Sequence, residues 1–485
     1  MSVKAQSGSG SWLPVALALP VFAVALAPLV FAVAPYLSRQ LWFDEALTVL
    51  NFACLDSPVD IYRAYVIPNN HILYTVVLHY FLKLLPPGFP PDLWLRLPSL
   101  VFAVALLVYT WRRFRRICGA LPLWITLALL AISPPFLVFA TAVRGYMLGA
   151  LFSVWAAGCA LELAASFRIK PFVKYFIASL GAVLTVPSDL AALAGAALFS
   201  LPLCGAKFWK TRRFYVLLLT PVLALAFGYL PILENFIRVA RLGEGWQNRW
   251  SSLAAVGLAL ASAFGALLLL LPAEWARSFR RRRRELWRAA LWLLPLPAAF
   301  VFAVAPFPRV YFPLFPILAL TAARALRRFG GPVWYRSASS RSVHLKLVVG
   351  VGVLVLSVSL WHPVLGKLSP YVGGDLGDDF FYGYHLRPEH QPAKVAEALE
   401  KLRAPIVYFS FLSDPWANMF NHLMRGGKAE YLFDGPRGQV VELPIGAAAV
   451  LRRDEAPGVL ERRFGRKLRQ VSETPACRIF TVEAL

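Results

Sequence analysis

Long apolar blocks separated by short basic loops dominate this chain, and they constrain its fold more than any other feature. A chain of 485 residues with 58% hydrophobic, 14% aromatic and only 16% charged residues has the composition of a polytopic membrane protein. Reading each block as a bilayer-spanning helix predicts about eleven spans, at 12–36, 96–111, 121–140, 145–166, 172–187, 190–206, 214–233, 251–272, 288–305, 310–326 and 346–362. The first block is too long for the core of a signal peptide, so we expect a retained helix.

Every second loop is rich in arginine and lysine. The basic loops lie at 112–116, 168–174, 207–213, 277–288 and 324–346. Because such loops stay in the cytoplasm, the pattern predicts a multi-pass protein of the inner (plasma) membrane with its N-terminus inside. It also accounts for the formal net charge of +24 without nucleic acid, since no soluble module presents the basic runs.

The alternation of loops holds only if the apolar segment 71–85 does not cross the membrane. That segment is short for a span, carries His79 and Lys83, and repeats its large apolar residues at helical spacing. We therefore expect a helix that lies in the membrane interface, within one long extracytoplasmic loop over residues 37–95.

The chain changes character after the last predicted span, which ends near Trp361. Residues 1–362 are predicted to form the membrane domain and residues 363–485 a small extracytoplasmic α/β domain. Its predicted strands are 405–410, 429–433, 446–453 and 478–484, and its predicted helices 392–403 and 414–425. The sequence leaves open whether Cys54 and Cys477, both expected outside the cytoplasm, form a disulfide.

Two adjacent acids, Asp44 and Glu45, follow the first predicted span in the run "WFDEAL". Acids in the first turn of a helix complement its dipole, which is the structural interpretation. In the chemical interpretation, a carboxylate at the membrane surface, with a like-charged neighbour that tunes its pKa, acts as a general base. The pattern alone does not decide which of the two acids would do so.

Three arginines at predicted outer helix ends are candidates for substrate binding. Arg96, Arg144 and Arg309 are among the few positive charges on a side that the topology keeps poor in them. Each either anchors a helix end or belongs to a cluster that neutralises a phosphate. Tyr146 and Tyr311 each lie two residues after one of these arginines and are candidates for the same site.

Two further polar residues lie where outer helix ends are expected. His71, in "NNHILY", is a candidate helix cap, phosphate ligand or metal ligand. Asp189, in "TVPSDLA", either caps the following helix or contacts substrate. The sequence leaves these interpretations open for each residue.

Five motifs in order resemble the GT-C superfamily of membrane glycosyltransferases. They are "WFDEAL", "NNHILY", "LRLPSLVFA", "RGYMLGALF" and "PRVYFPLFPILAL", within residues 12–326. They look most like the RgtA/B/C/D-like branch, which is related to protein O-mannosyltransferases and aminoarabinose transferases.

The resemblance implies an inverting hexosyl- or pentosyltransferase at the extracytoplasmic face. Such an enzyme moves a monosaccharide from a polyprenyl-phosphate donor to a hydroxyl of an envelope glycan, lipid or protein. The resemblance further implies that Asp44 is the catalytic base, that Glu45 helps to shape the site, and that Arg144 and Arg309 contact the donor phosphate.

Two departures from the family pattern bear on cofactors. Ile72 replaces a proline after the histidine, and Ala142 and Val143 stand where relatives carry an acid before the arginine. The resemblance therefore brings no metal ligand or second acid to those positions, and a divalent metal stays open as a cofactor.

Three other functions remain as alternatives: a transporter or flippase for a lipid-linked sugar, an oligosaccharide polymerase or ligase, and a scaffold. A transporter is disfavoured because the ionisable residues lie at helix ends rather than at mid-helix. A polymerase or ligase would differ by using a diphosphate donor that carries a chain. A scaffold would bind the lipid-linked sugar without transferring it.

Overall fold

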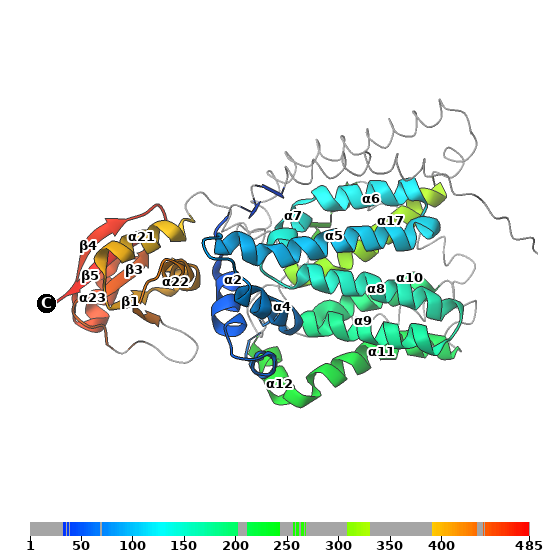
Figure 1. Ribbon diagram of the computed structural model, residues 1–485, viewed down its shortest axis with the longest axis horizontal. Helices are drawn as coiled ribbons and strands as arrows, with labels where there is room; N and C mark the ends of the chain where they lie inside the picture. Colours follow the sequence, from blue (N-terminus) through cyan, green and yellow to red (C-terminus); the bar gives the residue numbers. More distant parts are fainter. Residues whose placement is uncertain are drawn as a thin grey trace, which may run out of the picture.

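The structure is a computed structural model in which a bundle of long helices carries a small α/β domain at one end (Figure 1). It describes residues 33–34, 36–37, 39–67, 70–201, 211–242, 256–257, 259–260, 263–265, 267, 308–329, 390–433, 440 and 442–484. Four predicted spans (12–36, 251–272, 288–305 and 346–362), the basic loop 277–288 and the predicted domain boundary lie wholly or largely outside these residues.

The bundle helices, apart from α12, overlap the remaining predicted spans. They are α5 (Pro91–Cys118), α6 (Ala120–Ile132), α7 (Pro134–Thr141), α8 (Tyr146–Ala165), α9 (Ile169–Thr185), α10 (Leu190–Ser200), α11 (Arg212–Tyr229), α12 (Leu233–Leu242) and α17 (Phe315–Phe329). Among the described residues, four helical stretches are long and apolar enough to cross a membrane, or five if α6 and α7 count as one. The prediction of a polytopic α-helical membrane protein is confirmed, whereas the described residues do not test the count of eleven.

The span predicted at 121–140 is broken rather than continuous. α6 and α7 meet at Ser133 with a bend of 67°. Pro134 and Pro135 start α7 directly after the bend, and a proline supplies no N–H to continue the preceding helix. The bend leaves α7 fully inside the bundle, close to the start of α8.

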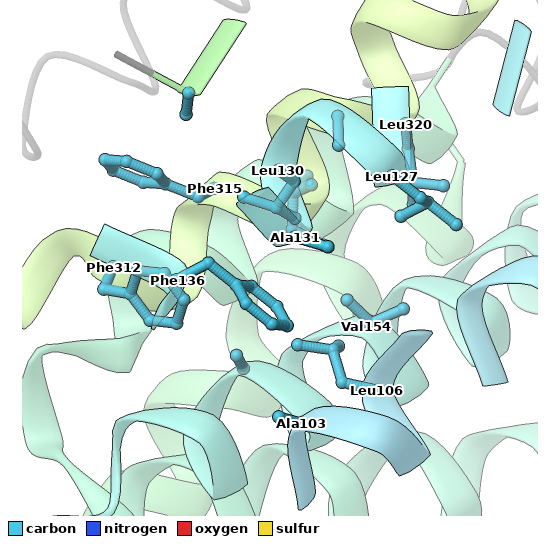
Figure 2. Packing of buried hydrophobic residues seen from close by; sticks show 14 of the residues in the cluster. Ala103, Leu106, Leu127, Leu130, Ala131, Phe136, Val154, Phe312, Phe315 and Leu320 are labelled. Carbon is cyan, nitrogen blue, oxygen red and sulfur yellow. The ribbon is translucent and has the colours of Figure 1, made fainter. Parts of the chain in front are cut away.

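A large apolar core fixes the late helix against the early ones. Phe312 and Phe315, around the start of α17, pack with Phe136 of α7, Leu106 of α5 and Val154 of α8 (Figure 2). Lipid is as apolar as these side chains, so close packing rather than escape from water holds the helices together. The packing sets the position of η8 (Pro308–Leu314), the 3₁₀ helix that leads into α17.

The alternating loops gather at opposite ends of the bundle. At one end, the Arg327 side chain donates hydrogen bonds to the carbonyls of Arg116 (3.0 Å) and Ile117 (2.6 Å), so two basic loops touch. The same end brings Arg213 to the Ala164 carbonyl at 2.8 Å. The described parts of the basic loops 112–116, 207–213 and 324–346 therefore lie at one end of the bundle.

The first long loop begins and ends at the opposite end of the bundle. It contains α2 (Phe43–Thr48), the π-helix η1 (Val49–Ala53), α3 (Pro58–Arg63) and α4 (Ile72–Lys83). The Leu41 N–H donates to Asp92 Oδ1 at 3.1 Å, which joins the start of the loop to the start of α5. α4 buries Tyr74 and Leu78 and exposes Tyr80, the arrangement expected of a helix with one apolar face in the membrane interface.

The C-terminal domain is a five-stranded sheet with helices, as the sequence predicts. Its elements are α21 (Pro392–Leu402), β1 (Ile406–Phe409), α22 (Pro415–Met424), β2 (Glu430–Phe433), β3 (Ala448–Arg452), α23 (Pro457–Phe464), β4 (Lys467–Glu473) and β5 (Cys477–Glu483). The strand order is β2-β1-β3-β5-β4, with β1 parallel to β2 and β3 and with β5 antiparallel to β3 and β4.

Two features of this domain differ from or extend the sequence prediction. β4 and α23 were not predicted, because β4 is an edge strand in which Leu468 alone is buried and no apolar alternation marks it. Cys54 is an exposed free thiol and Cys477 a buried one. No disulfide therefore joins them in this structure.

Candidate active site

The acidic pair occupies the first turn of α2, at the end of the bundle that faces the C-terminal domain (Figure 1). Asp44 is 5% exposed and Glu45 1% exposed. Burying a carboxylate costs several kcal/mol unless it is paired and hydrogen-bonded. The partners of the two acids therefore define what each can do.

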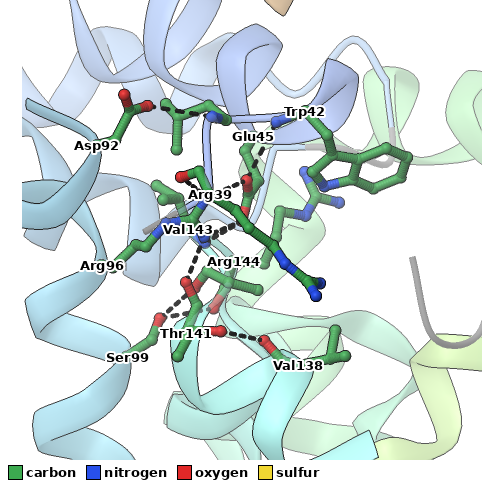
Figure 3. A network of polar contacts seen from close by, with 12 residues as sticks. Arg39, Trp42, Glu45, Asp92, Arg96, Ser99, Val138, Thr141, Val143 and Arg144 are labelled. Atoms are coloured by element: carbon green, nitrogen blue, oxygen red, sulfur yellow. Dashed lines mark hydrogen bonds and ion pairs between the residues drawn. The ribbon is translucent and has the colours of Figure 1, made fainter. Parts of the chain in front are cut away.

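Glu45 is held from four directions. Arg96 of α5 meets it with two parallel contacts, Nη1 to Oε1 at 3.1 Å and Nη2 to Oε2 at 3.2 Å (Figure 3). The N–H of Val143 donates to Oε1 at 2.7 Å, and the N–H of Trp42 donates to Oε2 at 3.2 Å. The Glu45 carboxylate is thus an anchor between α2, α5 and the α7–α8 connection.

The Arg96 guanidinium is equally engaged with the fold. Besides Glu45, it donates to the carbonyls of Thr141 (2.6 Å), Arg39 (3.1 Å) and Gln40 (3.2 Å). It is 1% exposed. Because Arg96 binds Glu45 through two contacts and also three carbonyl oxygens, its role is to hold these segments in position rather than to bind substrate.

Asp44 has different surroundings. Its Oδ2 lies 2.7 Å from Nη2 of Arg309, which η8 brings from a point 265 residues further along the chain. The Arg309 guanidinium also lies over the Trp42 ring, 5.6 Å from its centroid. The acidic motif and the "PRVYF" motif therefore meet in space.

Arg144 lies beside Asp44 and reaches back to His71. Its Nη1 donates to the Thr48 hydroxyl at 2.7 Å and to the Asp44 backbone carbonyl at 3.3 Å, while its Nη2 lies 2.9 Å from Nε2 of His71. Arg144 is 1% exposed. His71, Arg144 and Arg309 form one group around Asp44, which we call the N–H cluster.

His71 is electrostatically constrained. Burial lowers its pKa well below the ordinary value, and the positive charges of Arg144 and Arg309 lower the pKa further, so the ring is neutral. Its Nδ1 accepts a hydrogen bond from the Gly145 N–H at 3.0 Å, which puts the ring proton on Nε2. His71 Nε2 and Arg144 Nη2 lie side by side at 2.9 Å, so an acceptor oxygen beside the pair, off the line that joins the two nitrogens, is within reach of both.

Gly145 makes this arrangement sterically feasible. A Cβ at this position would lie 2.9 Å from His71 Nδ1 and 2.6 Å from Cγ2 of Thr185. Any side chain here would displace the imidazole or the end of α9. The glycine of "RGYM" is therefore part of the site, although it has no reactive group.

Of the two candidate tyrosines, Tyr146 contacts the N–H cluster. The Tyr146 ring meets the His71 ring edge-on at 5.0 Å between centroids, and the Arg144 guanidinium lies 6.0 Å from the Tyr146 centroid. Tyr311 is half-buried in η8, two residues after Arg309. Tyr146 begins α8 directly after the segment that carries Arg144, and Tyr311 shares η8 with Arg309.

Asp189 is buried without a visible partner. It ends the 3₁₀ turn η2 (Pro187–Asp189), is 0% exposed, and neither carboxyl oxygen accepts a hydrogen bond from the residues that the structure describes. A Cβ on Gly149 of α8, one turn beyond Gly145, would lie 2.1 Å from its Oδ2. Burial raises the pKa of Asp189 well above the ordinary value, so the group is held neutral.

The donor set does not suit a metal ion. Over the described ranges, no group of three His, Cys, Asp or Glu side chains is placed to hold one. His71 turns both ring nitrogens toward N–H groups rather than toward acids. We therefore derive no step through a metal.

Two residues of the site escaped the sequence interpretation. Trp42 stacks under Arg309, and Thr48 accepts a hydrogen bond from Arg144. Both belong to "WFDEALT", one helical turn or less from Asp44. The spacing of Thr48 was a usable signal, because it lies four residues after Asp44 and residues three or four apart share a helix face. Trp42, two residues before Asp44, follows no such rule.

Comparison with solved structures identifies the fold. The chain is similar to ArnT from Cupriavidus metallidurans bound to undecaprenyl phosphate, with 17% sequence identity and a TM-score of 0.57 over 97% of this chain and 98% of that one. It is similar to the apo state of the same protein, with 18% identity and a TM-score of 0.55 over 96% and 98%. No family model and no curated protein matches the sequence. The chain therefore has the fold of these ArnT structures, a helical membrane bundle with a small C-terminal α/β domain.

Proposed function

We propose that this protein is an inverting glycosyltransferase that moves one sugar from a polyprenyl-phosphate donor to an acceptor hydroxyl. The observation that carries the proposal is the N–H cluster around Asp44, in which the Nε2–H of His71 and the Arg144 guanidinium meet at 2.9 Å. A phosphate oxygen beside this pair of nitrogens, at hydrogen-bond distance from each, would accept from both. Such groups favour a ligand that is anionic before and after reaction.

The leaving group needs stabilisation rather than a proton. When the bond between C1 of the sugar and the phosphate oxygen breaks, the electron pair stays on the polyprenyl phosphate and its negative charge grows. Arg144 and His71 would donate to that oxygen, and Arg309 would add positive charge nearby. Removing one such donor typically costs about 3 kcal/mol of transition-state stabilisation.

Asp44 is the proposed general base. Its carboxylate would take the hydroxyl proton of the acceptor as the acceptor oxygen bonds to C1, on the face opposite the phosphate. One displacement of this kind inverts the anomeric centre. Its Oδ2 lies 2.7 Å from Nη2 of Arg309, so the proposed base stands beside one of the groups that would stabilise the phosphate.

The remaining candidates take supporting roles in this proposal. Glu45 and Arg96 position α2, because their polar atoms are engaged with one another and with the backbone. Tyr146 and Tyr311 would line the sugar site beside the cluster, and Asp189 would offer a neutral carboxyl to a sugar hydroxyl.

Two further observations support the donor class and the side of the membrane. The ArnT structure of the same fold is bound to undecaprenyl phosphate, a polyprenyl phosphate. The basic loops gather at the end opposite Asp44, and such loops face the cytoplasm. We infer an extracytoplasmic active site at the inner membrane, with an envelope glycan, lipid or protein as the acceptor.

Mass spectrometry of envelope glycans and lipids from a deletion strain tests the proposal. We expect one sugar to be missing from one carrier, to return with the wild-type gene, and to stay missing with Asp44→Asn at equal membrane abundance. An unchanged envelope, together with no binding of undecaprenyl phosphate by the purified protein, would reject the proposal.

A further inference from the structure

The C-terminal domain packs directly on the helix that carries the acidic pair. Phe420 of α22 is fully buried in the same cluster as Leu41 and Ala46, which flank Asp44 and Glu45. Trp416 packs against that cluster and also against the core of the C-terminal sheet. α2 is therefore held between the bundle and α22, which lie side by side in Figure 1.

Polar contacts from the same domain hold the backbone just before α2. The N–H of Ala393, at the start of α21, donates to Gln40 Oε1 at 2.9 Å. His390 forms a hydrogen bond with the backbone of Leu41. Gln40 and Leu41 lead directly into the acidic pair, so the C-terminal domain contacts the segment from both sides.

Asp414 connects these contacts. It begins α22 with a left-handed backbone (φ 56°), which residues other than glycine rarely adopt. Its Oδ1 accepts from the Ala417 N–H at 3.3 Å and so caps the helix, while its Oδ2 lies 3.6 Å from Nδ1 of His390. The side chain is 6% exposed. A strained backbone that persists at a buried polar contact indicates a constraint from the surroundings.

We propose that the C-terminal domain is a working part of the active site, in which Asp414 and His390 are positioning residues that hold the Gln40–Glu45 segment in place. Neither touches the reacting atoms; they act through the backbone of Leu41 and the packing of α22 on α2. The claim that this positioning serves sugar transfer rests on the proposed function, whereas the positioning itself does not.

Charge makes the positioning sensitive to pH. The titratable groups that face Asp414 are His390, Asp44 and Glu45 of α2, and Cys477 of β5. Burial, with a smaller contribution from Asp44 and Glu45, raises the pKa of Asp414 to about 7. Below that pH the carboxyl is neutral; above it, a third negative charge repels the acidic pair and weakens the contact between α22 and α2.

Hydrogen exchange of the full-length protein in detergent tests the positioning directly. In Asp414→Ala, which loses the helix cap and the contact with His390, we expect the amides of residues 41–50 to exchange about fivefold faster or more. Asp454→Ala is the matched control, because Asp454 is a solvent-exposed acid of the same domain. Unchanged exchange in Asp414→Ala would overturn the inference, whatever the protein transfers.

The transfer reaction gives a second readout that a purely structural role would not move. Asp414→Asn keeps the capping oxygen and cannot ionise, so the ratio of its kcat to that of the wild type should rise severalfold as pH passes through about 7. The KM for the lipid-linked sugar should stay unchanged. A ratio that is flat between pH 6 and 8.5 would reject the role of Asp414. Absence of transfer by the wild type would instead reject the proposed function and leave the exchange result standing.

Discussion

Asp44 and Glu45 are neighbours in the chain, yet the two sides of α2 on which they lie differ in construction. On the Glu45 side, a bidentate arginine and two backbone N–H groups satisfy the carboxylate, and the arginine is in turn bound by three carbonyls. On the Asp44 side, Oδ2 meets Arg309, and the nearby His71 Nε2 and Arg144 Nη2 lie 2.9 Å apart.

The difference shows how one dipeptide can divide two tasks. A carboxylate with every lone pair engaged contributes rigidity, and it has no capacity left for a proton. A carboxylate beside donors that suit a shared acceptor can respond to a ligand. The two sides predict different responses to mutation, and four experiments would break or sharpen the distinction.

Asp44→Asn should have the largest effect. Losing a general base and its charge should lower sugar transfer by on the order of 10⁴-fold. The amide oxygen can still accept from Arg309, so the protein should insert and melt like the wild type. The assay is product formation per amount of membrane protein, with undecaprenyl phosphate binding measured in parallel. An active variant would transfer the base assignment to another group.

Glu45→Ala should act through stability. It leaves the Arg96 guanidinium buried without its carboxylate, which typically costs about 3–5 kcal/mol. We expect low abundance in membranes and a lower melting temperature in detergent. A Glu45→Leu/Arg96→Met double variant, which removes both charges, should recover part of that loss. A stable Glu45→Ala protein that has lost transfer would give Glu45 a chemical role instead.

Arg309→Lys tests the Asp44 side while keeping its charge. A lysine can pair with Asp44, but it cannot reproduce the planar guanidinium over Trp42 or reach two acceptors in one plane. Transfer should fall about 10²-fold, with the melting temperature nearly unchanged. Arg238→Lys, on an exposed helix face, is the control. Equal activity of both variants would show that Arg309 acts as a simple counter-charge.

Asp189→Asn should have the smallest effect of the four variants, and its effect on stability should depend on pH. Because the folded-state pKa of Asp189 is raised, the wild type is most stable at low pH and loses stability as pH rises from about 4 through the raised pKa. The asparagine variant has no such loss, so its advantage should grow by at most about 1.4 kcal/mol per pH unit. Melting curves at pH 6 and 7 measure it; a constant difference would mean that Asp189 has found a partner.

The bundle and much of the site can be predicted from the sequence because both depend on patterns that are visible along the chain. Apolar block length and loop charge locate the helices. The same alternation brings Asp44, His71, Arg144 and Arg309 to one end, although they come from four separate motifs.

The pairing of acids with arginines has no such signal. Arg96, Arg144 and Arg309 are equivalent by position in the sequence, and the rotation of each helix decides which of them Glu45 takes. The contribution of Asp414 is equally hidden, because "SDPW" reads as an ordinary helix start. Edge strand β4 lacks a buried stripe and therefore a pattern.

The contact between Asp44 and Arg309 spans 265 residues, and this separation has a consequence for biosynthesis. A ribosome that has threaded only the first half of the chain into the bilayer has made an acid with no counter-ion. The contact between Asp44 and Arg309 can therefore form only after residue 309 has been synthesised and the late helix has packed against the early ones.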